Sequence, residues 1–588
     1  MQKNPKMKQK LTLFLALLLI GTGLCACGKA PQQEIPAEAT AQVTTEAPAP
    51  VTPLVTDGQA GYAIIRGENA AQATIDAAIQ LRQLIGDATG AFPDLATDWH
   101  KRGTELDHEK PEILVGMTEF GESTAAMAEL GYGDYIITRV GEKLIINAWS
   151  EVALGEAINQ FGAYVRENGK SGELILPADF NLSGTALPIL NEIPHYAGAE
   201  LRSVYHAGDN NQVVILSDTD PAEYADYRKA LEADGFTLYT ENEITDNRFA
   251  TYTNDKYVVT AGYYGYNSEA RIIVEPRKTL PPQESENQYT KVIEPSFAML
   301  GVEFMNGDSL TTNGQCFIYQ LCDGSYIIVD GGLTRARDAQ AIYDYLRTHA
   351  PDPNNITIAA WFITHAHGDH HGAYATFSKT YAQKVKVELI IGNFPAEEAR
   401  LAGGLGTDGN GGPTVLTYTK RFDGAEFIKA HVGQKFYLRD AEIEILYTLE
   451  SYAPGVLDYF NTSSLVFTVN LGGQRFLVTG DASNAALKIT TQMYGEYLKS
   501  DFVQVAHHGG STGSTGTESV SKTYTLAASP VVLWPTGLEY YPKRLSSPQN
   551  VTIFELDSTR EIFVAGSREV RFTLPYTVGT SGLESILQ

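Results

Sequence analysis

The sequence has few cysteines, few basic residues and no long apolar run after its first twenty residues. Four cysteines in 588 residues exclude a fold held together by disulfides. Beyond Leu11–Ile20, no segment reaches the about eighteen uninterrupted apolar residues that a membrane-spanning helix needs. The 44 Lys and Arg stand against 70 Asp and Glu, a net charge of −26. Because such a surface repels polyanions, this balance argues against a dedicated nucleic-acid binder.

The overall amino-acid composition is that of a folded chain. Hydrophobic residues make up 43% and aromatic residues 10%, which excludes wholesale disorder and the collagen-like and coiled-coil classes. A chain of 588 residues is too long for one hydrophobic core, so we expect roughly two to four domains.

The first residues have the pattern of an export signal. Met1–Lys10 carries four lysines and no acidic residue, and Leu11–Ile20 is mainly apolar. Residues 24–27 then resemble a bacterial lipobox, in which Cys27 is the lipidated residue. Residues 28–58 are rich in Ala, Pro, Thr and Glu and predict a flexible linker. We therefore expect a lipoprotein anchored to the extracellular face of the cell membrane; the alternative is an ordinary cleaved signal.

Three folded units are predicted after this linker. Residues 59–187 alternate β-rich runs with helical patterns and predict a small α/β domain. Residues 195–280 predict a second, α+β domain. Neither contains a cluster of His, Cys and Asp residues, so we expect both to present substrate or to act as spacers. A polar, proline-bearing segment then leads into the third unit, residues 295–588.

The clearest chemical motif follows an apolar run that ends at Thr364. The order His-x-His-x-Asp-His places His365, His367, Asp369 and His370 within six residues. Two histidines two apart in an extended segment point the same way and can reach one cation, while the next two donors can face a second. Imidazole and carboxylate suit zinc, manganese or iron. A histidine-rich surface turn is the alternative, which the preceding buried strand disfavours.

This motif resembles the signature of the metallo-β-lactamase-fold hydrolases, and the resemblance extends over about residues 299–576. It implies a C-terminal αββα sandwich preceded by two smaller α/β units, an α/β (α+β) multidomain chain. It also implies two divalent metal ions that together activate a hydroxide, with zinc expected and manganese or iron as alternatives.

Three later strand ends fit the order of motifs in that family. Asp330, after the run CFIYQLCDGSYIIV, would support the site without binding metal. Asp481, in RFLVTGDAS, stands where the family places its bridging carboxylate. DFVQVAHHGGS ends in His507 and His508, one of which should complete the second metal's shell. We favour His507 as the metal ligand and His508 as a catalytic residue that faces the substrate, while Asp369 would position the attacking water.

One position departs from the family pattern. Many members carry a further histidine ligand about twenty residues before the bridging aspartate, and here that place holds Asn461, which we assign a supporting role. The first metal would then keep only His365, His367 and Asp481, with water. The remaining motifs resemble the branch that includes the metallohydrolase domain of competence DNA-uptake proteins and bacterial choline-phosphate esterases. The predicted metal ligands are His365, His367, Asp369, His370, Asp481 and His507.

This branch predicts hydrolysis of phosphodiester bonds in an extracellular or cell-surface substrate. A β-lactam, or another ester or amide, is the alternative substrate. The alternative class of protein is a binding lipoprotein with a vestigial metal site, and the absence of the further histidine ligand supports it. Nucleic acid is a less favoured partner, and the oligomeric state stays open. Residues 401–414 are rich in glycine, and the sequence favours a mobile flap and an ordinary surface loop equally. We expect His431 to have a structural role.

Overall fold

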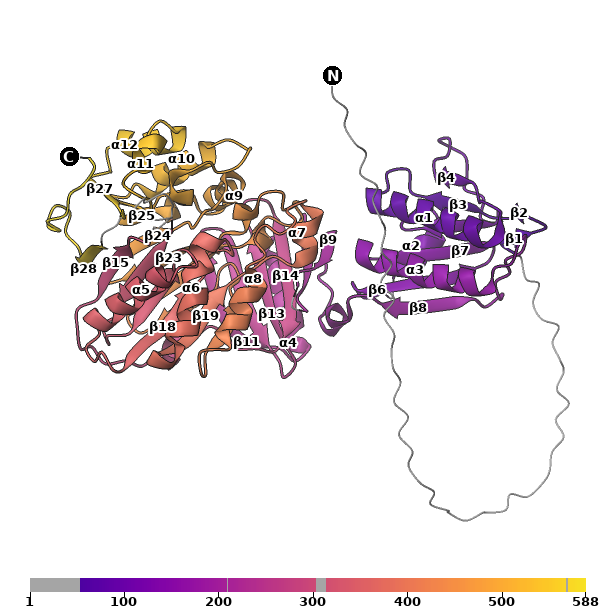
Figure 1. The fold of residues 1–588 in the computed structure, drawn as a ribbon. Coiled ribbons are helices and arrows are strands. Elements are labelled where there is room, and N and C mark those ends of the chain that lie inside the picture. Colours follow the sequence, from indigo (N-terminus) through magenta and orange to yellow (C-terminus); the bar gives the residue numbers. More distant parts are fainter. Residues whose placement is uncertain (1–52, 129, 209, 303–313, 567–568, 588) are drawn as a thin grey trace, which may run out of the picture. The chain divides into compact units, whose positions relative to one another are not determined.

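The computed structural model describes residues 53–587, apart from residues 129, 209, 303–313 and 567–568 (Figure 1). Among these residues, none of the helices combines the length and the apolar character required to cross a membrane. The predicted signal, Cys27 and nearly all of the predicted linker lie outside the described part of the chain.

The first unit is a six-stranded sheet with helices on both faces, preceded by the short pair β1 (Val55–Thr56) and β2 (Gln59–Ala60). Alternate strand residues separate its two faces: Ile64 and Ile113 belong to the core with α1 and α3, while Ile65 and Leu114 pack beside Phe120, which precedes α2. The strands lie in the order β4 (Leu95–Thr97), β3 (Ala63–Arg66), β5 (Glu112–Val115), β7 (Lys143–Ala148), β6 (Asp134–Val140) and β8 (Asn181–Thr185), and the helices are α1 (Gln72–Thr89), α2 (Gly121–Met127) and α3 (Glu151–Asn168).

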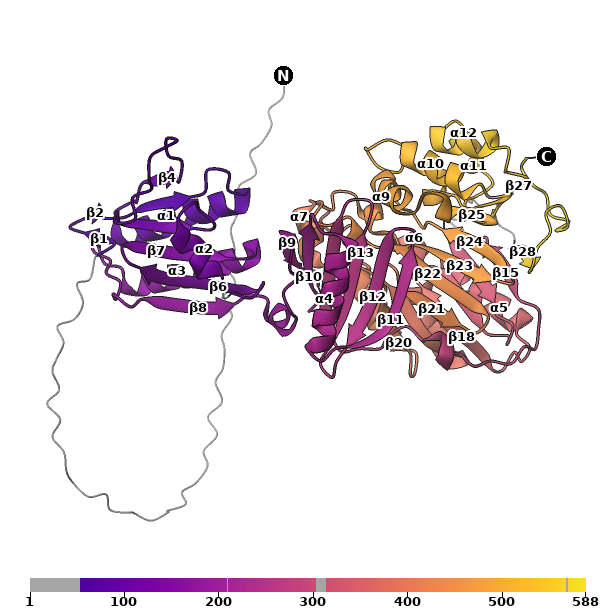
Figure 2. The same cartoon turned by 180° about the vertical axis from the view of Figure 1, so that it is seen from behind.

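The second unit is an antiparallel six-stranded sheet, seen well in Figure 2. One face packs against helix α4 (Pro221–Ala233), whose first turn is closed by a capping box between Asp220 and Glu223. The other face contributes Ile244, Phe249 and Tyr264 to a core that it shares with the C-terminal domain. The strands lie in the order β11 (Thr237–Ile244), β12 (Asn247–Thr253), β13 (Tyr257–Tyr264), β14 (Glu269–Pro276), β10 (Gln212–Ser217) and β9 (Glu200–His206).

The C-terminal domain consists of two seven-stranded sheets packed face to face. The first sheet has the order β20 (Glu426–Lys429), β19 (Val385–Gly392), β18 (Ile356–Phe362), β17 (Tyr326–Asp330), β16 (Cys316–Gln320), β15 (Ser296–Leu300) and β28 (Glu569–Thr573). The second has the order β21 (Lys435–Leu438), β22 (Ala441–Tyr447), β23 (Val466–Leu471), β24 (Gln474–Val478), β25 (Phe502–Gln504), β26 (Val531–Trp534) and β27 (Glu561–Val564). The inner faces share one apolar core, in which Phe297 and Phe476 meet at 5.0 Å between ring centroids.

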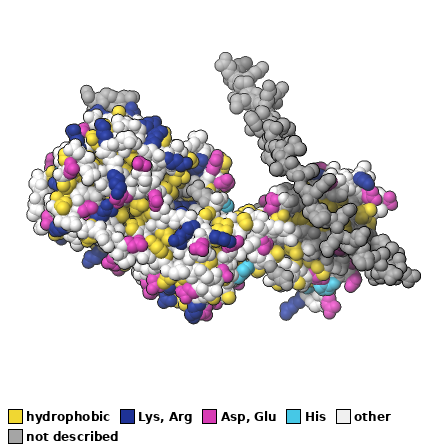
Figure 3. Space-filling model, turned by 90° about the horizontal axis from the view of Figure 1, so that it is seen from below, with side chains coloured by type: hydrophobic (Ala, Val, Ile, Leu, Met, Phe, Trp, Pro, Cys, Tyr) yellow, Lys and Arg dark blue, Asp and Glu magenta, His cyan; other side chains and the backbone are white. Residues whose placement is uncertain are grey.

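Helices cover both outer faces of this sandwich, so the predicted αββα arrangement is confirmed. The first sheet is covered by α5 (Ala336–His349), α6 (Gly368–Thr380) and α8 (Gly412–Thr419), as Figure 1 shows, and α7 (Glu397–Ala402) precedes α8. The second sheet is covered by α9 (Asn484–Tyr494), α10 (Glu518–Ala527) and α12 (Pro548–Glu555), with α11 (Tyr541–Arg544) before α12. On the face of the molecule in Figure 3, acidic and basic side chains are interspersed.

Candidate metal centre

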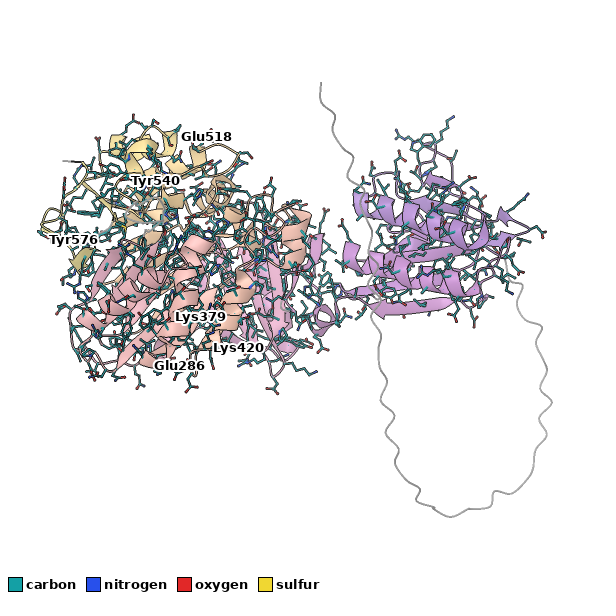
Figure 4. All side chains as sticks on the ribbon, in the orientation of Figure 1. Glu286, Lys379, Lys420, Glu518, Tyr540 and Tyr576 are labelled. Atoms are coloured by element: carbon teal, nitrogen blue, oxygen red, sulfur yellow. The ribbon has the colours of Figure 1, made fainter. Side chains whose placement is uncertain are left out.

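The residues of the histidine motif occupy the turn between β18 and α6. The strand ends at Phe362, and α6 begins at Gly368 directly after His367. Lys379, labelled in Figure 4, lies near the last turn of α6, so the motif lies at the opposite, N-terminal end of this helix. His365 and His370 are fully buried, whereas Asp369 keeps 32% of its side chain exposed. The motif therefore combines buried imidazoles with one accessible carboxylate.

Asp330 fixes this turn from the neighbouring strand. Because β17 and β18 are parallel neighbours, both end at the same edge of the sheet. Asp330 Oδ1 accepts from the Thr364 backbone N–H at 2.8 Å, and Oδ2 accepts from Thr364 Oγ1 at 2.9 Å and from His370 Nδ1 at 2.8 Å. The carboxylate is fully buried, so it orients His370 while facing away from solvent.

Asp481 approaches the turn from the second sheet. It follows β24 and Gly480, whose φ of +51° lies in the left-handed region. A Cβ at Gly480 would lie 2.9 Å from the Cβ of Thr364, so only glycine permits the two strand ends to come this close. Asp481 is 1% exposed and reaches the histidines of the first sheet across this contact.

His507 and His508 lie after β25, the parallel neighbour of β24. Both residues are left-handed, with φ of +48° and +51°. Such backbone costs about 1–2 kcal/mol per residue, and neighbouring groups hold it in place. The His508 carbonyl accepts from Trp534 Nε1 at 2.8 Å and from Arg544 at 2.6 Å. The turn allows two consecutive side chains to face the same region, which an extended strand would prevent.

Six ligand-type residues converge into two groups that share Asp481. Within each group, one ligand atom per residue lies within 4.8 Å of every other. The first group contains His365, His367 and Asp481. The second group is formed by Asp369, His370, Asp481 and His508. His507 contacts Asp481 but falls in neither group.

The second group contains His508 where the sequence analysis favoured His507. His508 Nε2 lies 3.2 Å from His370 Nε2 and 3.4 Å from Asp481 Oδ1, while the ring of His507 faces the other oxygen, Oδ2. The geometry therefore places His508, rather than His507, in the group that contains Asp369, while His507 lies at the other oxygen of Asp481. The two neighbours could not be distinguished in the sequence because their directions depend on the left-handed backbone.

Hydrogen bonds around the second group leave ring nitrogens facing each other without a proton. His370 Nδ1 must donate to Asp330, and His508 Nδ1 must donate to the Pro535 carbonyl at 2.6 Å, because both partners only accept. In the neutral rings, both Nε2 atoms then carry lone pairs, yet they lie 3.2 Å apart. Two acceptors at this distance repel unless they share a proton or bind one metal ion.

The first group shows the same arrangement. His367 Nε2 donates to Asp408 Oδ1 at 3.0 Å, and His365 Nδ1 donates to Thr364 Oγ1 at 3.1 Å. The remaining nitrogens, His367 Nδ1 and His365 Nε2, face each other at 3.0 Å. This is the tautomer pattern of metal-binding histidines, in which the second nitrogen donates to a carboxylate, hydroxyl or carbonyl.

The residues present fit divalent metal ions. Asp481 Oδ1 is buried and lacks a hydrogen-bond partner among the described residues. Burial lowers the pKa of His365, whereas the carboxylates of Asp481 and Asp330 outweigh burial and raise the pKa of His370. Burial thus favours a neutral His365 with a free lone pair, and Asp481 favours a positive charge beside it, whether from a proton on His370 or from a metal ion. Histidine and aspartate together are ligands for zinc, manganese or iron.

The structure adds residues that the sequence analysis did not assign. The glycine-rich segment lies at the site, since its Asp408 bonds to His367. Gln504 donates to the Gly480 carbonyl at 2.8 Å and to Gln315 Oε1, and Gln315 donates to Asp330 at 3.0 Å. These contacts join segments far apart in the chain, and only the glycine-rich composition of 401–414 gave a signal in the sequence.

Tyr459 lies beside His507, and Asn461 lies beside Tyr459. Tyr459 Oη is 3.5 Å from His507 Nδ1, and Asn461 Nδ2 donates to Tyr459 Oη at 3.2 Å. Burial, and then the charge of Asp481, raises the pKa of Tyr459 to about 12, so its hydroxyl keeps its proton at neutral pH. His431 lies elsewhere, buried between Glu275 and Glu450.

One known family model matches the part of the chain that contains this site. The family model described as Metallo-beta-lactamase superfamily matches residues 311–517, which include every residue of both groups. The site therefore belongs to a metallo-β-lactamase superfamily domain.

Several solved structures resemble part of the chain at low sequence identity. YhfI from Bacillus subtilis, a metallo-β-lactamase fold protein, is 12% identical, and the match covers 47% of this chain and all of YhfI, with a TM-score of 0.30. CmlA, a diiron β-hydroxylase from Streptomyces venezuelae, is 13% identical over 51% of this chain and 55% of CmlA, with a TM-score of 0.30. Unliganded yeast PDE1 is 13% identical over 48% of this chain and all of PDE1, with a TM-score of 0.31. None of the curated proteins compared with the chain matches it.

Proposed function

We propose that the C-terminal domain is a metal-dependent hydrolase that cleaves phosphodiester bonds. The observation that carries this proposal is the pair of facing nitrogens on each side of Asp481, at 3.0 Å in the first group and 3.2 Å in the second. A metal ion at each pair would bind both nitrogens, and Asp481 belongs to both groups, so the residues are arranged for two cations that share one carboxylate.

The chain's own residues have distinct tasks in such a centre. His365 and His367 would hold one ion, and His370, His508 and Asp369 would hold the other, with Asp481 between them. When bound, divalent ions lower the pKa of water towards neutrality and stabilise charge that develops on the substrate. Asp369 is the accessible member of its group, so its carboxylate orients the attacking water and faces the substrate.

A centre with this shared carboxylate suits phosphodiesters, and the resemblance of the motifs favours them over amides. Centres that present two cations to one phosphoryl group are used by phosphatases and nucleases, where they stabilise both the attacking and the leaving oxygen. The run from Asn461 to His508 also resembles the competence and choline-phosphate esterase branch.

We further propose that the substrate belongs to the cell envelope. This rests on the export signal and on Cys27, whose lipidation would anchor the chain at the extracellular face of the membrane. The net charge of −26 and the interspersed charges in Figure 3 make long nucleic acids a poor substrate.

Hydrolysis of model esters tests this function. The purified protein, supplied with zinc, manganese or iron, should cleave bis(p-nitrophenyl) phosphate or p-nitrophenyl phosphorylcholine. Asp481→Asn should lower the rate by about a thousandfold, since losing a bridging ligand removes several kcal/mol of transition-state stabilisation. Asp423→Asn changes an exposed carboxylate outside both groups and is the matched control.

Two results would reject the proposal in different ways. Hydrolysis of nitrocefin with both phosphate esters left intact would assign the site to β-lactams. A metal-loaded protein that leaves all three compounds intact would indicate a vestigial centre and a binding lipoprotein.

A further inference from the structure

The two metal groups are unequal in their protein ligands. The second group has four ligand residues, but the first has only His365, His367 and Asp481. Asn461 stands where many members of the resembling family carry a histidine, so that position supplies no imidazole here. The first group is therefore one ligand residue short of the second.

The two oxygens of Asp481 divide the surrounding histidines between the groups. Oδ1 faces His370 Nε2 at 3.2 Å and His508 Nε2 at 3.4 Å. Oδ2 faces His365 Nε2 at 3.9 Å and His507 Nε2 at 3.7 Å. Each oxygen is therefore flanked by one histidine of the motif after β18 and one histidine of the turn after β25.

The ring of His507 is held in the tautomer that a ligand requires. Its Nδ1 faces the backbone carbonyl of Ser511, which only accepts, so Nδ1 carries the proton. Nε2 then has a free lone pair, and it points towards Asp481 Oδ2. His508 has the same arrangement, with its Nδ1 on the Pro535 carbonyl. Adjacent left-handed residues thus present two equivalent nitrogens to the two oxygens of one carboxylate.

We propose that His507 Nε2 is the imidazole ligand that completes the first metal group. The inference rests on the metal centre of the proposed function, and it assigns the two neighbouring histidines to different ions. Asn461 is the competing candidate, since its buried Oδ1 has no hydrogen-bond partner among the described residues. That oxygen forms no hydrogen bond to a member of the first group among the described residues, whereas His507 Nε2 lies 3.7 Å from Asp481 Oδ2.

Asparagine substitutions test the roles of His507 and His508 one at a time, with little change to the backbone. Asparagine tolerates the left-handed region, and its amide can replace Nδ1 while leaving no atom at the position of Nε2. His507→Asn and His508→Asn therefore form a matched pair. Asn461→Ala tests the competing ligand. Metal content after gel filtration, metal affinity by chelator competition and the visible spectrum of the cobalt-loaded protein are the readouts, with thermal melting of the metal-free proteins as the folding control.

The wild-type protein should hold two ions, and His507→Asn should hold one, with the affinity of the lost site reduced at least about a hundredfold. His508→Asn should lose the other ion, so the cobalt spectra of the two variants should differ. Two retained ions of unchanged affinity in His507→Asn would overturn the proposal, as would loss of the first ion in Asn461→Ala alone. Because these readouts do not depend on turnover, they stay decisive even if the phosphate esters prove not to be substrates.

Discussion

Glu450 lies in a buried cluster of charges between the second unit and the C-terminal domain. It is 5% exposed, and its carboxylate accepts from His431 Nδ1 at 2.9 Å and from Asn393 Nδ2 at 2.9 Å. His431 Nε2 faces Glu275 of β14 at 3.2 Å, so the imidazole joins the two parts of the structure. Glu450→Gln removes one negative charge and keeps the size of the side chain.

The expected loss of stability follows from the burial of this cluster. Removing one partner of a buried ion pair costs about 3–5 kcal/mol, because the other charge stays buried. Glutamine can still accept from Asn393, so we expect the lower end, about 3 kcal/mol. Urea unfolding of the metal-free protein, followed by the fluorescence of the buried Trp361 and Trp534, measures this change. Glu426→Gln, an exposed glutamate on β20, is the control.

The loss should depend on pH in a defined direction. Burial lowers the pKa of His431, but Glu450 and Glu275 outweigh it and raise that pKa above its unfolded value. The contribution of the imidazolium is therefore complete below about pH 6.5 and is lost as the pH rises through the folded pKa. The pKa of Glu450 is lowered, so its contribution is present above about pH 4.5 and is lost in acid. This reasoning would be refuted if Glu450→Gln changed the free energy of unfolding by less than about 0.5 kcal/mol at pH 6. It would also be refuted if the loss of stability grew as the pH rose from about 6 to 9.

Two further predictions concern the metal centre and the anchor. Asp330→Asn should weaken metal binding about 10–100-fold, because Asp330 orients His370 through Nδ1, and an unchanged affinity in chelator competition would contradict that role. Cys27→Ala should abolish incorporation of a labelled fatty acid and release the protein from the membrane fraction; a variant that labels and fractionates like the wild type, with Cys25 also replaced, would reject the lipid anchor.

Much of the site could be predicted because its ligands follow strand ends that are visible in the sequence. The motif from His365 to His370 is local, and Asp330 and Asp481 each end an apolar run. The αββα arrangement, which is confirmed, could be predicted because the same motifs resemble those of the metallo-β-lactamase-fold hydrolases.

The remaining features depend on tertiary contacts or on unusual backbone. The separate directions of His507 and His508 come from two consecutive left-handed residues, which composition does not reveal. Asp408 reaches His367 from 41 residues away, through a segment for which the sequence favoured a flap and a surface loop equally. Gln504 donates a hydrogen bond to Gln315 although 189 residues separate them in the chain.

Anomalous X-ray diffraction from crystals of the zinc-loaded protein, measured at the zinc edge, tests the central claim most directly. We expect two peaks that share Asp481, one beside His365 and His367 and the other beside His370 and His508. A map without a peak at Asp481, from protein shown to bind zinc in solution, would contradict the claim.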